Sequence, residues 1–198
     1  GSKGAYGPEE LAAWYDKLLA DKQFQQVVAY VYPNVPMEAV AKKMHACKTN
    51  LDFQRSFCYI IRRKLIAEQS NGIDMDFHNV DIHKRYTFVS NHRDIVLDSA
   101  FLDKCLIDTG FGTTSEIAIG DNLLQLDWVR ALARINKTFT VERALKSSEM
   151  LRASKRMAEY MHFVVAQKND NIWIAQREGR AKNSNDLTQP AILKMMAM

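Results

Sequence analysis

The chain has 198 residues, of which 47% are hydrophobic, so it is long and apolar enough to bury one sizeable core. Its formal net charge of +4 suits an anionic small substrate or a negatively charged membrane surface, and the dense Lys/Arg clusters that favour nucleic acid are missing. No apolar run approaches the roughly 18–20 residues that cross a bilayer. The 3 cysteines show neither a disulfide framework nor a metal-ligand spacing, which predicts a reducing compartment, the cytoplasm.

The N-terminal third of the chain has apolar residues at mostly helical spacing, which predicts a helical lobe over residues 1–70. Pro8, which is followed by two glutamates, is well suited to the first turn of a helix. A small basic cluster at residues 62–64 is interpreted as a solvated helix face rather than as a membrane-facing patch. The helices expected in this lobe span residues 8–31, 36–47 and 51–69.

Beyond a turn at residues 70–72 the pattern changes, and short strand-like runs alternate with helical segments. Such alternation predicts an α/β domain over residues 71–198, with a mostly parallel sheet flanked by helices. Residues 187–198 look like the start of a further helix, so we expect the chain to be truncated at its C-terminus. The expected strands are Tyr86–Val89, Glu116–Ile119, Thr138–Val141 and Ile172–Ala175, and the expected helices span about 94–107, 121–135 and 145–167.

His92 is the strongest candidate for a catalytic residue, because it lies in a polar turn between an expected strand and an expected helix. The near-neutral intrinsic pKa of histidine suits a general base at working pH. Asp94 and Asp98 follow closely, and a carboxylate that is hydrogen-bonded to one ring nitrogen would fix the tautomer. The alternative is that Asn91 or Asp94 only caps the helix.

Basic residues follow two other expected strands: Arg143 after the third, and the segment Glu178-Gly179-Arg180 after the fourth. Because parallel strands end at the same edge of a sheet, these residues and His92 are predicted to border one cleft. Arginine is suited to bidentate contact with a phosphate, and glycine allows a positive φ. Taken singly, the alternatives are a surface arginine and a charged turn.

Together these segments resemble the first three motif blocks of the glycerolipid acyltransferase family, which includes glycerol-3-phosphate and lysophosphatidate acyltransferases, and most nearly its divergent members from Bacteroides-like bacteria. The similarity covers roughly residues 80 to 185. The proline that usually precedes the third block is replaced by Arg177, and the fourth block would lie beyond Met198. The matching blocks are Asn91-His92-Arg93-Asp94 with Asp98, Asn136 to Arg143, and Ile174 to Arg180.

The resemblance implies a transferase of phospholipid biosynthesis that works at the cytoplasmic surface of the inner membrane. It would move a fatty acyl group from coenzyme A or acyl carrier protein to a hydroxyl of a glycerol-phosphate-type acceptor, with no metal and no bound cofactor. A lyso-amino-acid lipid as acceptor, a non-catalytic phosphate-binding module, and a membrane-surface or interaction domain remain as alternatives. The residues implied in substrate binding are Arg93, Arg143, Glu178, Gly179 and Arg180.

The resemblance also assigns His92 as the general base, with Asp98 preferred over Asp94 as its partner. The family separates the histidine and the aspartate by four residues, whereas five lie between His92 and Asp98. In a regular helix, residues six apart would be separated by about 9 Å along the axis, so the turn must fold back for Asp98 to reach His92.

Overall fold

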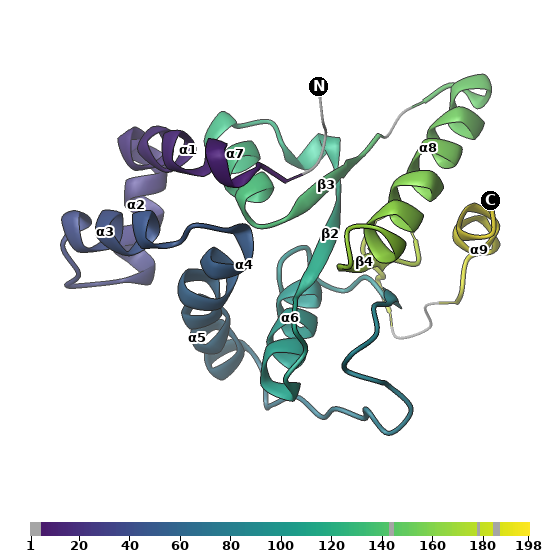
Figure 1. The fold of residues 1–198 in the computed structure, drawn as a ribbon, viewed down its shortest axis with the longest axis horizontal. Helices are drawn as coiled ribbons and strands as arrows, with labels where there is room; N and C mark the ends of the chain where they lie inside the picture. The colour runs from purple at the N-terminus through teal and green to yellow at the C-terminus, as the bar shows by residue number, and fades with distance from the viewer. Residues whose placement is uncertain (1–4, 143–144, 178, 184–186) are drawn as a thin grey trace.

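The computed structural model describes residues 5–142, 145–177, 179–183 and 187–198 of the chain. It is an α/β protein, in which a four-stranded parallel sheet of order β1-β4-β2-β3 is flanked by helices (Figure 1). This confirms the predicted fold class. The strands are β1 (Thr87–Ser90), β2 (Ser115–Gly120), β3 (Thr138–Val141) and β4 (Asn171–Ala175).

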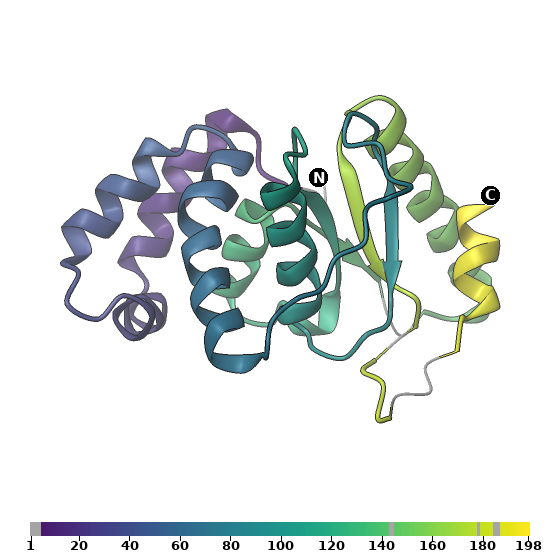
Figure 2. The same cartoon turned by 90° about the horizontal axis from the view of Figure 1, so that it is seen from below.

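Helices cover both faces of the sheet. α6 (Leu97–Thr109) connects β1 to β2 and α7 (Asp127–Ile135) connects β2 to β3, whereas α8 (Ser147–Ala166) returns from β3 to β4. Because the return runs in the opposite direction along the sheet, right-handed connections place α8 on the face opposite to α6 and α7. Figure 2 shows the two layers, with α9 (Pro190–Met196) packed beside α8.

The region before the sheet is helical, as expected, but the single helix predicted over residues 8–31 is split. Asp21 separates α1 from α2, because its Oδ1 accepts hydrogen bonds from the backbone N–H groups of Gln23 and Phe24 at 2.9 and 3.0 Å. No described helix is both long and apolar enough to cross a bilayer. The segments are α1 (Pro8–Ala20), α2 (Lys22–Val31), α3 (Met37–Ala46), α4 (Asn50–Phe53), a π-helical turn (Gln54–Cys58) and α5 (Tyr59–Gln69).

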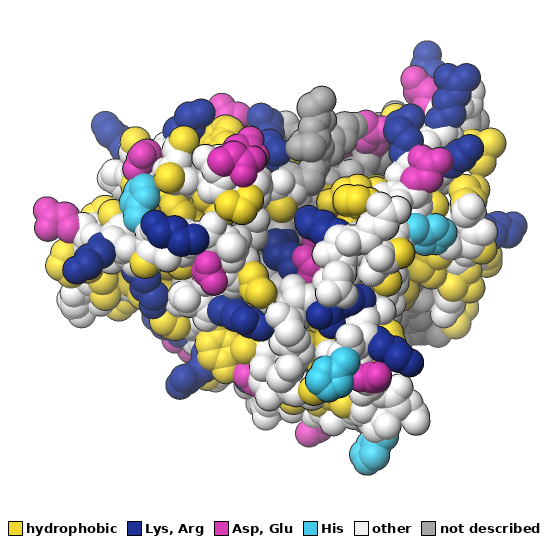
Figure 3. Space-filling model, in the orientation of Figure 1, with side chains coloured by type: hydrophobic (Ala, Val, Ile, Leu, Met, Phe, Trp, Pro, Cys, Tyr) yellow, Lys and Arg dark blue, Asp and Glu magenta, His cyan; other side chains and the backbone are white. Residues whose placement is uncertain are grey.

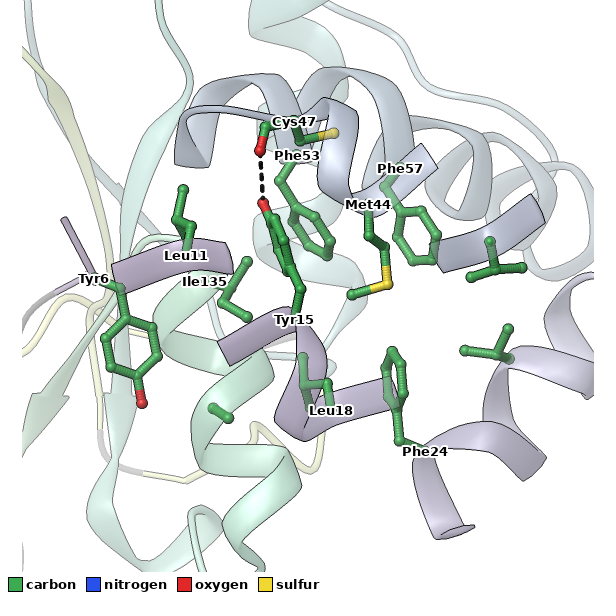
Figure 4. Packing of buried hydrophobic residues seen from close by; sticks show 13 residues of the cluster. Tyr6, Leu11, Tyr15, Leu18, Phe24, Met44, Cys47, Phe53, Phe57 and Ile135 are labelled. Atoms are coloured by element: carbon green, nitrogen blue, oxygen red, sulfur yellow. Dashed lines mark hydrogen bonds between the residues drawn. The ribbon is translucent and has the colours of Figure 1, made fainter. Parts of the chain in front are cut away.

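One apolar core joins these helices to the layer that covers the sheet. Tyr15 stacks on Phe53 with ring centroids 5.8 Å apart, and both side chains are buried with Ile135 of α7. Figure 4 shows the Tyr15 hydroxyl pointing at the backbone carbonyl of Cys47, to which it donates a hydrogen bond of 3.3 Å. Burial raises the pKa of the Tyr15 phenol, with a smaller contribution from the neighbouring Cys47 thiol. The helical region therefore shares its interior with α7.

Replacing Tyr15 by Phe is expected to lower the free energy of unfolding by about 1 kcal/mol, because it removes one buried hydrogen bond but keeps the ring packing. The measurement is the urea unfolding midpoint. The matched control is Tyr30→Phe, since Tyr30 is 81% exposed, and its midpoint should equal that of the wild type. Equal midpoints for both variants would show that the hydroxyl contributes nothing.

A buried polar network lies at the amino ends of the strands. Lys137, which is 4% exposed, places its Nζ 2.6 Å from Oδ2 of Asp170 and 3.2 Å from Oγ1 of Thr114. Thr114 in turn donates to Gln54 in the π-helical turn, and Gln54 Nε2 donates to the carbonyl of Asn136 at 3.1 Å. The network therefore links the starts of three strands to the helical region.

Candidate active site

His92 lies at the carboxyl end of β1, in the turn that leads to α6. Its Nδ1 is 2.9 Å from Oδ2 of Asp98, and the two side chains are 12% and 14% exposed. A pair this close and this shielded holds the imidazole in one orientation. The site therefore contains a histidine–carboxylate pair at the edge of the sheet where ligands commonly bind in α/β folds.

Asp98 reaches His92 because residues 92–96 do not continue the helix towards the strand. They fold over the first turn of α6, where Oδ2 of Asp98 also accepts the backbone N–H groups of Arg93 at 2.8 Å and Asp94 at 3.1 Å. Three donors thus converge on one carboxylate oxygen, near the end of the helix whose dipole favours negative charge. The folded turn therefore brings Asp98 into contact with His92, although a regular helix would have kept the two residues too far apart for a hydrogen bond.

Asp94 has a different position. Its Oδ1 accepts the backbone N–H groups of Val96 and Leu97, both at 2.8 Å, as an N-terminal capping residue does. Of the two candidate partners, Asp98 contacts the imidazole of His92, whereas Asp94 accepts hydrogen bonds from backbone N–H groups at the start of α6.

Strand β4 supports the turn that carries His92. The ring of Trp173 meets the His92 ring edge-on at 6.3 Å, and its Nε1 donates to Ser90 Oγ at 2.9 Å. Gln176 Nε2 donates to Asn91 Oδ1 at 2.5 Å. None of these three contacts was among the sequence predictions, since a tryptophan within a strand and a glutamine just after it have no pattern that indicates their partners.

The segment after β4 also lies beside His92. The backbone N–H of Ala181 donates to the carbonyl oxygen of His92 at 2.6 Å, so the chain that carries Arg180 passes next to His92. Gly179 has φ of +74°, in the region that favours glycine, as the turn prediction allowed. Arg93, expected to bind substrate, donates from Nη1 to the backbone carbonyl of Asn183 at 2.6 Å and so anchors this segment. Glu178 lies outside the described residues.

The other predicted phosphate ligand, Arg143, also lies outside the described residues, but the strand that precedes it is placed. β3 is at the opposite edge of the sheet from β1, with β4 and β2 between them. Three strand spacings correspond to about 14 Å. The structure therefore brings the third motif block next to His92 and ends β3 well away from it.

A large groove lies on the face of the sheet that α8 and α9 cover, between β3 and these helices. It measures about 670 Å³, and mostly apolar side chains line it, among them Phe139, Val141 and Met157. Neither His92 nor Arg180 borders this groove. The sequence did not predict it, because it depends on the packing of β3 against α8, which are separate segments of the chain.

A buried carboxylate lies behind Tyr160 and Lys168, two of the residues that line the groove. Glu116 of β2 is fully buried; it accepts a hydrogen bond of 2.5 Å from the Tyr160 hydroxyl and pairs with Lys168. Burial raises the pKa of the Tyr160 phenol, and the Glu116 carboxylate raises it further. Glu116, Tyr160 and Lys168 satisfy one another and so support the wall of the groove.

Among the residues that the structure describes, no three His, Cys, Asp or Glu side chains are grouped so as to hold a metal ion. A comparison of the chain with protein-family models and with curated proteins found no match. The chemical groups that define the site are the pair of His92 and Asp98 and the segment after β4.

Proposed function

We propose that the chain is an acyltransferase, which moves a fatty acyl group from a coenzyme A or acyl carrier protein thioester to a hydroxyl of a glycerol-phosphate-type acceptor. The observation that carries the proposal is the contact of 2.9 Å between His92 Nδ1 and Asp98 Oδ2 at the carboxyl end of β1. Acyl transfer to a hydroxyl requires a general base, and a histidine oriented by a carboxylate supplies one.

In the tautomer that donates from Nδ1 to Asp98, Nε2 of His92 carries the lone pair. Nε2 takes the proton of the acceptor hydroxyl as that oxygen attacks the thioester carbonyl, and Asp98 stabilises the imidazolium that forms. The C–S bond then breaks, and the departing thiolate receives the proton from the imidazolium. The imidazole returns to its starting state with no net change in protons.

Arg180 is the described residue best placed to hold an acceptor phosphate, because it is exposed and neighbours Ala181, whose backbone contacts His92. The motif blocks imply substrate-binding roles for Glu178 and Arg143 as well, although β3, which precedes Arg143, lies at the opposite edge of the sheet from β1. Binding of the phosphate would turn a bimolecular encounter into a positioned reaction. The proposed working place is the cytoplasmic surface of the inner membrane, where such acceptors reside.

The test is release of free thiol from acyl-coenzyme A or acyl carrier protein, with and without acceptor. Glycerol 3-phosphate, lysophosphatidate and a lyso-amino-acid lipid are tried in turn, since a carboxylate can also satisfy an arginine. Thiol release that depends on one of these acceptors is the expected result. Binding of glycerol 3-phosphate without thiol release from any pair would instead indicate a non-catalytic phosphate-binding module.

The two aspartates beside His92 are expected to differ. Asp98→Asn replaces a charged hydrogen-bond partner by a neutral one, which should lower the turnover number about tenfold to a hundredfold. Asp94→Asn preserves a capping side chain, so its turnover should stay close to that of the wild type. Steady-state kinetics of the two variants distinguish these roles, and equal losses would contradict the assignment of Asp98.

A further inference from the structure

The first turns of α8 project beyond the other helices and strands that the structure describes, as Figure 1 shows at its upper right. Residues 148–152 are all exposed. Two of the exposed side chains are large and apolar: Met150 is 56% exposed and Leu151 is 65% exposed. Adjacent large apolar residues that are exposed at the end of a helix are suited to a docking surface.

The apolar residues continue the buried face of the helix. Met150 lies seven residues before Met157 and fourteen before Val164, so all three share one side of α8. Val164 is fully buried and Met157 partly buried, whereas Met150 is mostly exposed and lines the large groove. The core-facing side of α8 therefore runs outward into solvent.

Positive charge surrounds this apolar end. Lys146, Arg152 and Lys155 are exposed, and Figure 3 shows dark-blue side chains gathered over the projecting end of α8. Glu149 is the exposed acid among them, and its Oε2 accepts the backbone N–H of Lys146 as part of the helix cap. Basic side chains around exposed apolar ones complement the negative charge and the apolar interior of an anionic bilayer.

This end of α8 also lies on the side of the sheet that carries His92. α8 follows the carboxyl end of β3 and the His92 turn follows that of β1, and the two strands run in parallel. A bilayer beneath the end of α8 would thus lie on the same side of the molecule as the candidate site, where a lipid acceptor must arrive.

We propose that residues 146–155, the α8 tip, dock the protein on an anionic phospholipid surface. Met150 and Leu151 enter the headgroup region, and Lys146, Arg152 and Lys155 contact lipid phosphates. The membrane would be the source of the acceptor lipid, so this docking role rests on the proposed acyl transfer. Its test, however, is vesicle binding and does not depend on turnover. His92→Ala should bind vesicles like the wild type, so the two proposals can fail separately.

The experiment is flotation of the whole chain with phosphatidylcholine vesicles and with vesicles that also contain phosphatidylglycerol. Each basic residue near an anionic surface contributes about fivefold to partitioning, so Arg152→Gln/Lys155→Gln should bind phosphatidylglycerol vesicles about 25-fold more weakly. Met150→Ser/Leu151→Ser should lower binding to these vesicles about tenfold, and high salt should release this variant more completely than the wild type.

Two matched controls lie on the helical region. Arg63→Gln/Lys64→Gln removes two exposed charges from α5, and Val27→Ser/Tyr30→Ser removes two exposed apolar side chains from α2. Both should bind vesicles like the wild type, and thermal unfolding checks that all variants are folded. Wild-type binding by the tip variants, or loss of binding in the α5 control, would overturn the proposal. So would lipid-free self-association that Met150→Ser/Leu151→Ser abolishes, because the α8 tip would then be an interface between copies of the chain.

Discussion

Replacing His92 by Ala is expected to lower the turnover number for acyl transfer by about 10²–10⁴-fold, the usual contribution of a positioned general base. The fold should survive, because Asp98 keeps the backbone N–H groups of Arg93 and Asp94 as donors and is not left as an unpaired carboxylate. The measurement is acceptor-dependent thiol release at saturating acceptor, together with the thermal unfolding midpoint.

The matched control is His78→Ala. His78 also contacts an aspartate, Asp76, with 2.6 Å between Nδ1 and Oδ1, but both side chains are exposed in the connector before β1. His78 donates a backbone hydrogen bond and contacts Asp76 through its ring, which forms an exposed local pair, and these contacts lower the pKa of Asp76. Loss of turnover in His92→Ala alone supports the general base. Undiminished turnover in that variant would remove His92 from the mechanism.

Replacing Lys137 by Met is expected to lower the free energy of unfolding by about 3–5 kcal/mol. The ammonium of Lys137 lies 2.6 Å from Asp170 and is buried, so its removal leaves an uncompensated carboxylate inside the protein. Asp170 would still accept hydrogen bonds from Thr113 Oγ1 at 2.7 Å and from the backbone N–H of Asn171 at 3.1 Å. These two bonds offset only part of the stability lost with the lysine. Urea unfolding at equilibrium measures the change.

Two variants sharpen this test. Lys137→Met/Asp170→Asn removes both charges, and it should be more stable than the single variant if the unpaired carboxylate causes the loss. Lys155→Met replaces an exposed lysine and should stay within about 0.5 kcal/mol of the wild type. A wild-type midpoint for Lys137→Met would show that water or a shifted side chain satisfies Asp170. The kinetics at His92 should not change, because the network lies at the other end of the strands.

The strands were predictable from the sequence, whereas their order was not. Short apolar runs located each strand to within two residues, because buried parallel strands leave that pattern. The prediction that all strand ends border one cleft assumed that the strands carrying the motif blocks are adjacent in the sheet. The order β1-β4-β2-β3 instead puts β3 farthest from His92. That order depends on long-range packing, which a single sequence does not encode locally.

Local capping was predictable in part. The expected capping role of Asp94 agrees with the structure, as does the reach of Asp98 across the turn. Asp121 was expected to begin a helix, but residues 121–123 form one 3₁₀ turn and α7 begins at Asp127. Leu124, between the two, is buried, so tertiary packing overrides the helix start. Lys137 reads as a surface lysine in the sequence, and only the fold reveals its burial.

The edge position of β1 has a consequence for how the chain folds. β1 pairs with β4, and the Tyr86 backbone N–H bonds to the side chain of Asn171, 85 positions along the chain. Closing so long a loop carries a large entropy loss before any contact compensates it, so this pairing should form late. During synthesis, His92 leaves the ribosome long before Trp173 and Gln176, which hold its turn. The helical region and β2 with β3 can therefore assemble first, and the candidate site is completed when β4 inserts between β2 and β1.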